Sequence, residues 1–234
     1  KVSKCCKELL GWSEEELTLS EWSNFVHEDD VFKVLSYISK SMKYIMLIAV
    51  ALAFGIAGVS KSFSVIYYGK EFERCGTLLM MISPAIVFYA ASNILRNQYL
   101  LPKDMDRVFV TATVSASILN FVLNSIFIPV YGALGAVIGT VGAQFGELAY
   151  QALKTRKELP IKKYILYAFP YICFGAIMFF ACKRIEKIEG ISVVSLITQI
   201  IVGGIIFLIL VSIYFIITRD ELFSSIINKI KKKV

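Results

Sequence analysis

The chain has 234 residues, of which 57% are hydrophobic and 18% charged, with a mean hydropathy of +0.68 and a net charge of +7. Soluble domains are usually about 45–50% apolar and about 25% charged, so this composition argues against a soluble enzyme, a disordered tail or a disulfide-rich secreted module. The length accommodates about six membrane spans of about 20 residues each.

The charge is divided unequally near residue 30. Residues 1–30 contain three Lys and eight Asp or Glu, for a net charge of −5, whereas the remaining residues carry a net +12. We therefore predict an acidic segment or connector over 1–30, a membrane bundle over 31–218 and a basic amphipathic cytoplasmic tail over 219–234.

Six uncharged or nearly uncharged segments follow one another after residue 30. The longest uncharged run, Val108–Gly146, exceeds one span, and we expect Pro129 and Gly132 to form a tight turn within it. The alternation typical of β-barrel strands is absent. The sequence thus predicts an all-α, polytopic six-helix transmembrane bundle with spans at about 43–60, 75–98, 108–128, 132–153, 164–182 and 191–218.

Basic residues near the span ends predict the orientation. With a cytoplasmic N-terminus, the inner segments carry 15 Lys or Arg and the outer segments carry six. By the positive-inside rule, we expect a multi-pass protein of the cytoplasmic membrane with both termini in the cytoplasm. Cytoplasmic loops that follow this rule account for the net positive charge, which could otherwise indicate nucleic-acid binding. We therefore expect no nucleic-acid partner.

The sequence offers no residues arranged for catalysis or metal binding. His27 is the single histidine, and the five cysteines show no CxxC spacing. We therefore expect no catalytic residue, no metal site and no cofactor.

Polar groups within the third and fourth spans carry a family resemblance. Asn120 and Asn124 are four residues apart on one helix face, and IPVYGALGA follows from Ile128. YYGKEF at Tyr67–Phe72 and NILRNQYLLPKD at Asn93–Asp104 add support. This pattern resembles the multidrug/oligosaccharidyl-lipid/polysaccharide (MOP) exporter superfamily, most closely its Wzx-type polysaccharide biosynthesis flippases, over about residues 32–234.

The resemblance implies one lobe of a two-lobed transporter. Such proteins have twelve to fourteen helices, and the six spans here match the second lobe, so we expect an N-terminal lobe in cis or on a second chain. It also implies movement of a lipid-linked (undecaprenyl pyrophosphate) oligosaccharide across the cytoplasmic membrane for capsule or O-antigen synthesis. The partners would be membrane lipid and that lipid-linked oligosaccharide.

The acidic head resembles a different family. LLGWSEEEL at Leu9–Leu17 and FVHEDD at Phe25–Asp30 resemble the opening of a PAS sensor domain, although Glu28 stands where a proline usually follows the histidine. The other interpretation is an acidic amphipathic segment ahead of the first span.

Charged and amide side chains within the spans are the candidate substrate-binding residues, because polar groups in a membrane usually serve function or pair with one another. Arg96 either binds pyrophosphate or extends to the cytoplasmic interface. Glu147 pairs with Arg96, carries a coupling proton, or bonds a nearby span. The full set is Asn93, Arg96, Asn97, Asn120, Asn124, Gln144 and Glu147.

A second set is expected to be structural. Small residues at spacings of three or four permit close helix packing, and a proline next to them shapes the turn. This set is Pro129, Gly132, Gly135, Gly139, Gly142 and Gly146. For Asn120 and Asn124, hydrogen bonding between helices is an alternative to sugar binding.

Several other functions remain open at this level. A cation-coupled drug exporter of the MATE-like type or a lipid II flippase would share the superfamily fold. A structural bundle without transport activity, and a membrane-anchored PAS sensor fragment, belong to other classes.

Overall fold

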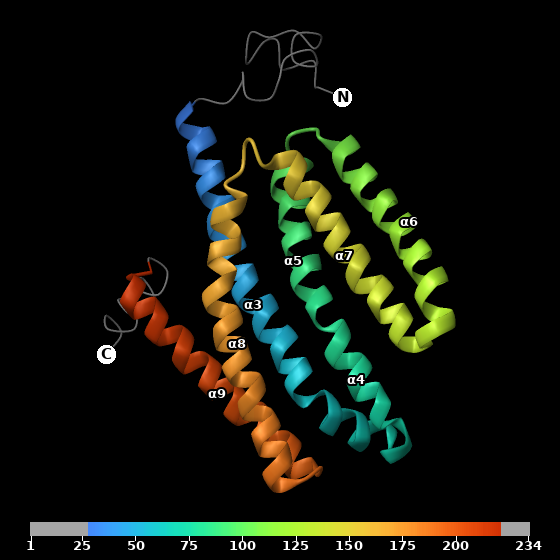
Figure 1. Ribbon diagram of the computed structural model, residues 1–234. Coiled ribbons are helices and arrows are strands. Elements are labelled where there is room, and N and C mark those ends of the chain that lie inside the picture. Colours follow the sequence, from blue (N-terminus) through green and yellow to red (C-terminus); the bar gives the residue numbers. More distant parts are fainter. Residues whose placement is uncertain (1–27, 221–234) are drawn as a thin grey trace, which may run out of the picture.

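The computed structural model describes residues 28–220, with side chains from residue 33, and these residues form helices joined by short turns (Figure 1). The helices are α3 (Glu28–Tyr68), α4 (Glu73–Ile82), α5 (Pro84–Leu95), α6 (Asp106–Tyr131), α7 (Ala133–Thr155), α8 (Ile161–Glu189) and α9 (Val193–Thr218). Residues 28–220 contain no strand, which confirms the all-α class. Most of the acidic head and almost all of the basic tail lie outside the described residues.

The predicted spans 43–60, 108–128 and 164–182 lie within single helices, α3, α6 and α8. The spans 132–153 and 191–218 begin one and two residues before α7 and α9, and 75–98 covers α4, α5 and part of the helical turn that follows α5. Five stretches are long and apolar enough to cross a membrane: Lys33–Tyr68, Lys70–Leu100, Asp106–Tyr131, Ile161–Glu189 and Val193–Thr218. The fold is therefore a polytopic membrane bundle. Helix α7 is not among the five, and it carries the polar residues Gln144, Glu147 and Gln151.

Two local signals explain how the helices break and turn. Pro84 opens α5 directly after Ser83, and its missing amide hydrogen makes the first helical turn its favoured position. Gly132 joins α6 to α7 at φ 58° and ψ −131°, in the left-handed half of backbone space that favours glycine. Pro129 does not form the turn predicted for it, because α6 continues through it to Tyr131.

The bundle has two halves, and α3 joins them. One half packs α8 and α9 against α3, and the other packs α7 against α5 and α6 against α7 (Figure 1). Most of the large buried side chains come from α3, α5, α8 and α9, with Tyr171, Ile38, Leu95 and Leu100 fully enclosed. The hairpin of α6 and α7 thus lies at the edge of the hydrophobic core.

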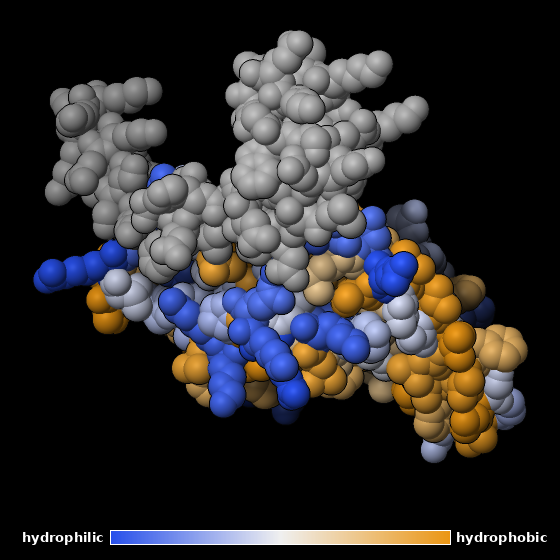
Figure 2. Space-filling view, turned by 90° about the horizontal axis from the view of Figure 1, so that it is seen from above, coloured by the Kyte–Doolittle hydropathy of each residue, from blue (hydrophilic) through white to orange (hydrophobic). Residues whose placement is uncertain are grey.

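Charged residues gather at the two ends of the helices, as a membrane bundle requires. The end formed by the start of α3, the α7–α8 connection and the end of α9 carries many Lys and Arg. Figure 2 looks down on this end and shows hydrophilic side chains gathered over it, with apolar side chains around its sides. We call it the basic end of the bundle.

Candidate functional site

Arg96 begins a single π-helical turn, Arg96–Leu100, that ends the second membrane stretch. The Leu101 amide donates to the Arg96 carbonyl at 2.9 Å, which is the i→i−5 bond of such a turn. The Arg96 guanidinium lies 5.1 Å from the ring centroid of Phe109 on α6, and its Nε donates to Asn97 Oδ1 at 3.2 Å. Arg96 forms no ion pair with any residue between 33 and 220.

The predicted pair between Arg96 and Glu147 is not formed. Glu147 Oε1 instead accepts hydrogen bonds from Thr113 Oγ1 of α6 at 3.2 Å and from Gln151 Nε2 of α7 at 3.4 Å. Of the roles weighed for Glu147, the geometry matches a bond to a neighbouring span. Arg96 and Glu147 therefore have different partners: Arg96 lies over the Phe109 ring, and Glu147 accepts hydrogen bonds from Thr113 and Gln151.

Asn120 and Asn124 bond to each other within α6. Asn124 Nδ2 donates to Asn120 Oδ1 at 2.8 Å, so the interhelical hydrogen bond expected from their spacing is replaced by an intrahelical one. The second amide oxygen, Asn124 Oδ1, points at Gly139 of α7. It forms no hydrogen bond within the described part of the chain, and the same holds for Gln144 Oε1 and Gln151 Oε1.

Four glycines of α7 allow α6 to approach closely. A β-carbon on Gly135 would overlap the backbone of Phe127, and one on Gly139 would overlap the Asn124 amide. A β-carbon on Gly142 or Gly146 would lie 2.8 Å from a leucine methyl of α6. Gly132 differs from these four, because a β-carbon there meets nothing within 4 Å and its role is the turn.

The polar residues of α6 and α7 therefore form a column along one helix pair. From Gln151 to Gly139 the column extends about 18 Å, or twelve helical residues. Three unpartnered amide oxygens, Asn124 Oδ1, Gln144 Oε1 and Gln151 Oε1, lie on it, with the Glu147 carboxylate between them. These three oxygens are buried, and Gln151 is fully enclosed, so they lie inside the bundle and not on an open surface.

Arg96, Asn93 and Asn97 lie at the basic end, beside the start of α6. The Arg96 amide donates to the Asn93 carbonyl in the last turn of α5, so these three residues form one local group. Tyr99 of the same π turn donates to Glu158 Oε2, and Lys103 pairs with that carboxylate. These bonds tie the turn to the α7–α8 connection and hold Arg96 in place.

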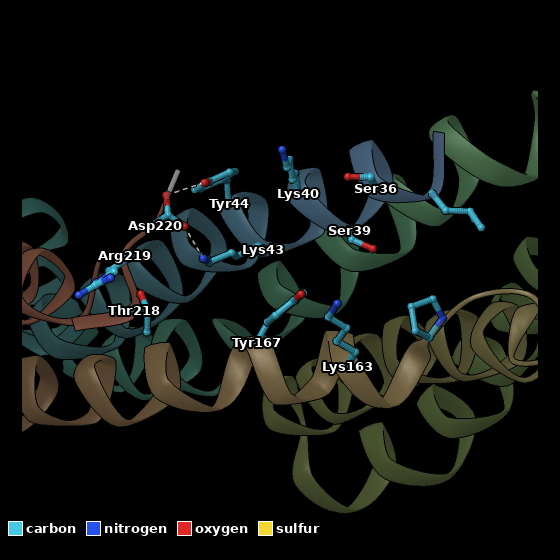
Figure 3. A pocket seen from close by; sticks show the side chains of 12 residues that line it. Ser36, Ser39, Lys40, Lys43, Tyr44, Lys163, Tyr167, Thr218, Arg219 and Asp220 are labelled. Carbon is cyan, nitrogen blue, oxygen red and sulfur yellow. Dashed lines mark hydrogen bonds and ion pairs between the residues drawn. The ribbon is translucent and has the colours of Figure 1, made fainter. Parts of the chain in front are cut away.

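Sequence reasoning missed a second polar group at the basic end. Lys43 of α3 pairs with Asp220, and Tyr44 Oη donates to the other carboxylate oxygen of Asp220 at 2.8 Å (Figure 3). The Asp220 side chain is only 4% exposed. Since 177 positions separate Lys43 from Asp220, no local pattern pointed to this contact.

Among residues 33–220, no three His, Cys, Asp or Glu side chains lie close enough together to hold a metal ion. The arrangement described so far offers binding groups, with one cation and several amide oxygens along a membrane bundle.

Comparison with models of known protein families shows to which family the chain belongs. Residues 8–202 match the family described as lipid II flippase MurJ. The chain belongs to this family. Its members are flippases, which transport and do not catalyse, so the chain is a membrane transport protein rather than an enzyme. No curated protein and no solved structure matches this chain.

The match supports a flippase family of the expected superfamily and leaves two finer expectations without support. It names a lipid II flippase family within the superfamily, where the motifs resembled the Wzx type most closely. It also begins at residue 8 and runs across Asp30, so most of the acidic head belongs to the matched region and a PAS origin gains no support.

Proposed function

We propose that this chain forms one lobe of a flippase that moves lipid II across the cytoplasmic membrane. The family match over residues 8–202 supports a flippase of a lipid-linked precursor, and lipid II is the substrate that the family's name gives. Moving a polar head group through hydrocarbon without a protein is prohibitive, because every unpaired polar group costs several kcal/mol there.

The environment of Arg96 is the main observation in support of a substrate site. It is a membrane-helix cation with no ion pair among residues 33–220, held on a π turn of the kind often found at functional sites. Its planar fork of donors matches phosphate oxygens, and the stacked Phe109 ring orients it. We assign it to the phosphate part of the substrate.

The amide column would then receive the rest of the head group. Asn93 and Asn97 flank Arg96, and Asn120, Asn124, Gln144 and Glu147 continue along α6 and α7. These four residues are half-buried, and the acceptor oxygens of Asn124 and Gln144 point inward, so the substrate would reach them only when the hairpin moves. We propose that the hairpin faces a second lobe, supplied in cis or by another chain, with both termini in the cytoplasm.

The experiment that tests this proposal is a flipping assay in proteoliposomes with labelled lipid II. We expect Arg96→Ala to reduce the flipping rate about 100-fold, since charge-assisted bonds to phosphate contribute about 1.5–3 kcal/mol. Arg107→Ala, an exposed arginine at the start of α6, is the matched control and should retain the wild-type rate. Normal flipping by Arg96→Ala would remove Arg96 from the substrate site.

The second lobe needs its own test. The chain reconstituted alone should not flip lipid II, and adding a six-span lobe of the same family should restore flipping. Flipping by the chain alone would contradict the two-lobe arrangement while leaving the substrate assignment intact.

A second candidate substrate is an undecaprenyl pyrophosphate-linked oligosaccharide. The motif IPVYGALGA with Asn120 and Asn124 favours it, because it resembles the Wzx-type exporters. Flipping of such a lipid in the same proteoliposomes, at a rate above that of lipid II, would support this candidate. Transport of a cationic drug would instead favour the multidrug branch of the superfamily.

A variant of Glu147 can distinguish a proton-coupling role of this residue from a structural one. The hydrogen bonds that Glu147 accepts from Thr113 and Gln151 favour a structural role. A glutamine at position 147 retains an oxygen that can accept both bonds, but it cannot carry a proton. We expect the Glu147→Gln variant to flip substrate with an unchanged dependence on pH between about pH 6 and about pH 8. A lost or shifted pH profile would assign the coupling proton to Glu147.

A further inference from the structure

Exposed cations gather on the connection between α7 and α8, at the basic end of the bundle (Figure 1). The ten residues from Lys154 to Lys163 contain five cationic side chains and a single acidic one, Glu158. All five cations are exposed: Lys154, Arg156, Lys157, Lys162 and Lys163. So dense a group of like charges creates a local positive potential that attracts an anionic partner.

These five cations form no ion pair with a carboxylate among residues 33–220. Glu158, the acidic residue between them, pairs instead with Lys103 and accepts a hydrogen bond from Tyr99. The other ion pairs of residues 33–220 involve lysines outside the connection: Lys43, Lys61 and Lys183. The connection therefore carries positive charge that the described part of the bundle does not neutralise.

Apolar side chains beside the cations indicate their depth in the membrane. Leu153, directly before the first cation, is 60% exposed, and Ile165 and Leu166 of α8 are 67% and 70% exposed. Lys163 and Lys183 are twenty residues apart on α8, a separation of about 30 Å that matches the thickness of the hydrocarbon layer. The connection thus lies at the level of the lipid head groups of one leaflet, and Lys183 lies near the other.

Two tyrosines mark the same level. Lys154 Nζ lies 5.5 Å from the ring centroid of Tyr150, and Lys163 Nζ lies 5.7 Å from that of Tyr167. Tyrosine is enriched where a membrane meets water, which agrees with the depth inferred from the apolar side chains. The other three cations form neither an ion pair nor a ring contact within the described part of the chain: Arg156, Lys157 and Lys162.

The opposite end of the bundle lacks this excess of charge. From Lys183 to Glu189, α8 has three cations and two carboxylates, and Lys183 pairs with Glu186 at 2.9 Å. Lys61 of α3 pairs with Glu73 of α4 at 2.7 Å at that end. Uncompensated positive charge is therefore a feature of the α7–α8 connection and not of both membrane surfaces.

We propose that the α7–α8 connection binds the phosphate groups of anionic phospholipids in the adjacent leaflet. Clusters of Lys and Arg at the ends of membrane helices attract such lipids, and the exposed apolar neighbours keep these cations at head-group depth. With both termini in the cytoplasm, as proposed above, this is the cytoplasmic leaflet. Binding here is independent of which lipid-linked substrate the chain moves.

A tryptophan at position 153 can report which lipids surround the connection. The full chain carries Leu153→Trp, with Trp12→Phe and Trp22→Phe so that one tryptophan remains. It is reconstituted in vesicles of equal parts phosphatidylglycerol and phosphatidylcholine, with bromine on the acyl chains of one lipid at a time. Bromine quenches tryptophan fluorescence, so the two measurements give the local lipid ratio. We expect phosphatidylglycerol to be preferred about five-fold at low salt, and the preference to disappear in molar NaCl.

The variant that removes the binding groups is Arg156→Gln/Lys157→Gln/Lys162→Gln, in which the preference should fall below about two-fold. The matched control removes three exposed cations of the opposite end, Lys70→Gln/Arg184→Gln/Lys187→Gln, and should keep the wild-type preference. The distance of about 30 Å between the two ends exceeds the Debye length of about 10 Å at moderate salt. Gel filtration and Tm identify any variant that misfolds, and the salt titration of the unchanged connection does not depend on the variants.

Three results would overturn the proposal. Equal quenching by the two brominated lipids at low salt would show that the connection selects no anionic lipid. A full preference in the folded triple variant would place the anionic lipid on other residues. Loss of the preference on adding millimolar inorganic phosphate at constant ionic strength would identify a site for free phosphate rather than for lipid head groups.

Discussion

The α6–α7 hairpin and the α3–α8–α9 half of the bundle are held together by different means. In the hairpin, glycines of α7 let the backbones approach, and only the small residues Ala112 and Ala116 of α6 are buried. In the other half, large side chains such as Tyr171, Phe207 and Phe215 fill the space between helices. Lipid is as apolar as a leucine side chain, so close backbone packing and polar bonds can replace a hydrophobic core.

The candidate substrate residues are distributed according to this difference. Five of the seven candidate substrate residues lie on α6, on α7 or at Arg96 beside α6, where few large side chains compete for space. The half with the large core has a pocket lined by polar and charged side chains at its end, between α3, α8 and the end of α9. A hairpin joined by small contacts can also shift against its neighbours with less repacking than an interlocked core.

The largest expected effect comes from emptying the core of the α3–α8–α9 half. Tyr171 is fully buried, and its ring lies 6.0 Å from that of Tyr214. Tyr171→Ala should lower the free energy of unfolding by about 3–5 kcal/mol, because the cavity cannot close completely. Thermal unfolding in detergent measures this. Phe121→Ala, at a site 73% exposed on α6, is the control and should change Tm little.

The next effect tests the glycine packing of the hairpin. A leucine side chain at position 135 would overlap the backbone of Phe127, so Gly135→Leu should cost about 3 kcal/mol. Gly204→Leu, which meets open space, is the matched control and should unfold at the wild-type temperature. Equal Tm values for the two variants would show that close approach does not stabilise the hairpin.

A smaller effect is expected at the buried amide of the large-core half. Gln199 is fully buried, and its Nε2 donates to Ser62 Oγ at 3.0 Å and to Ser195 Oγ at 3.1 Å. Gln199→Leu should lower stability by about 1 kcal/mol, since hydrogen bonds between membrane helices contribute modestly. The double variant Gln199→Leu/Ser62→Ala should recover part of that loss, because it removes the hydroxyl that the first change leaves unpaired. Urea or SDS unfolding of both variants checks the prediction.

The smallest effect is expected at the surface link between the halves. Glu158 is 44% exposed and pairs with Lys103. Glu158→Gln should lower stability by about 0.5 kcal/mol, an effect that salt reduces. Since Tyr99 also donates to Glu158, a larger loss that persists in high salt would identify that hydrogen bond as the main contribution.

Much of the fold could be predicted from local signals. Uncharged runs located the six helical segments, and Gly132 marked the hairpin turn. The helix ends were less predictable, because α3 and α8 extend well beyond their uncharged runs on charged, solvated turns. The glycine spacing of α7 also pointed to the face that α6 contacts.

The contacts between the candidate site residues could not be predicted from the sequence. Glu147 and Arg96 were the obvious ion pair by composition, yet Glu147 bonds Thr113 and Arg96 stacks on Phe109. Which groups meet depends on how each helix is rotated and tilted against its neighbour, and neither quantity follows from hydropathy.

The sequence by itself thus determined the membrane class and the helical segments, because hydropathy and turn chemistry act over a few residues, and its motifs indicated a flippase superfamily. Only the tertiary structure decided the Lys43–Asp220 pair, the intrahelical Asn120–Asn124 bond and the pocket at the basic end. The pair and the pocket unite the first and last described helices, and such distant contacts arise only when the whole bundle packs.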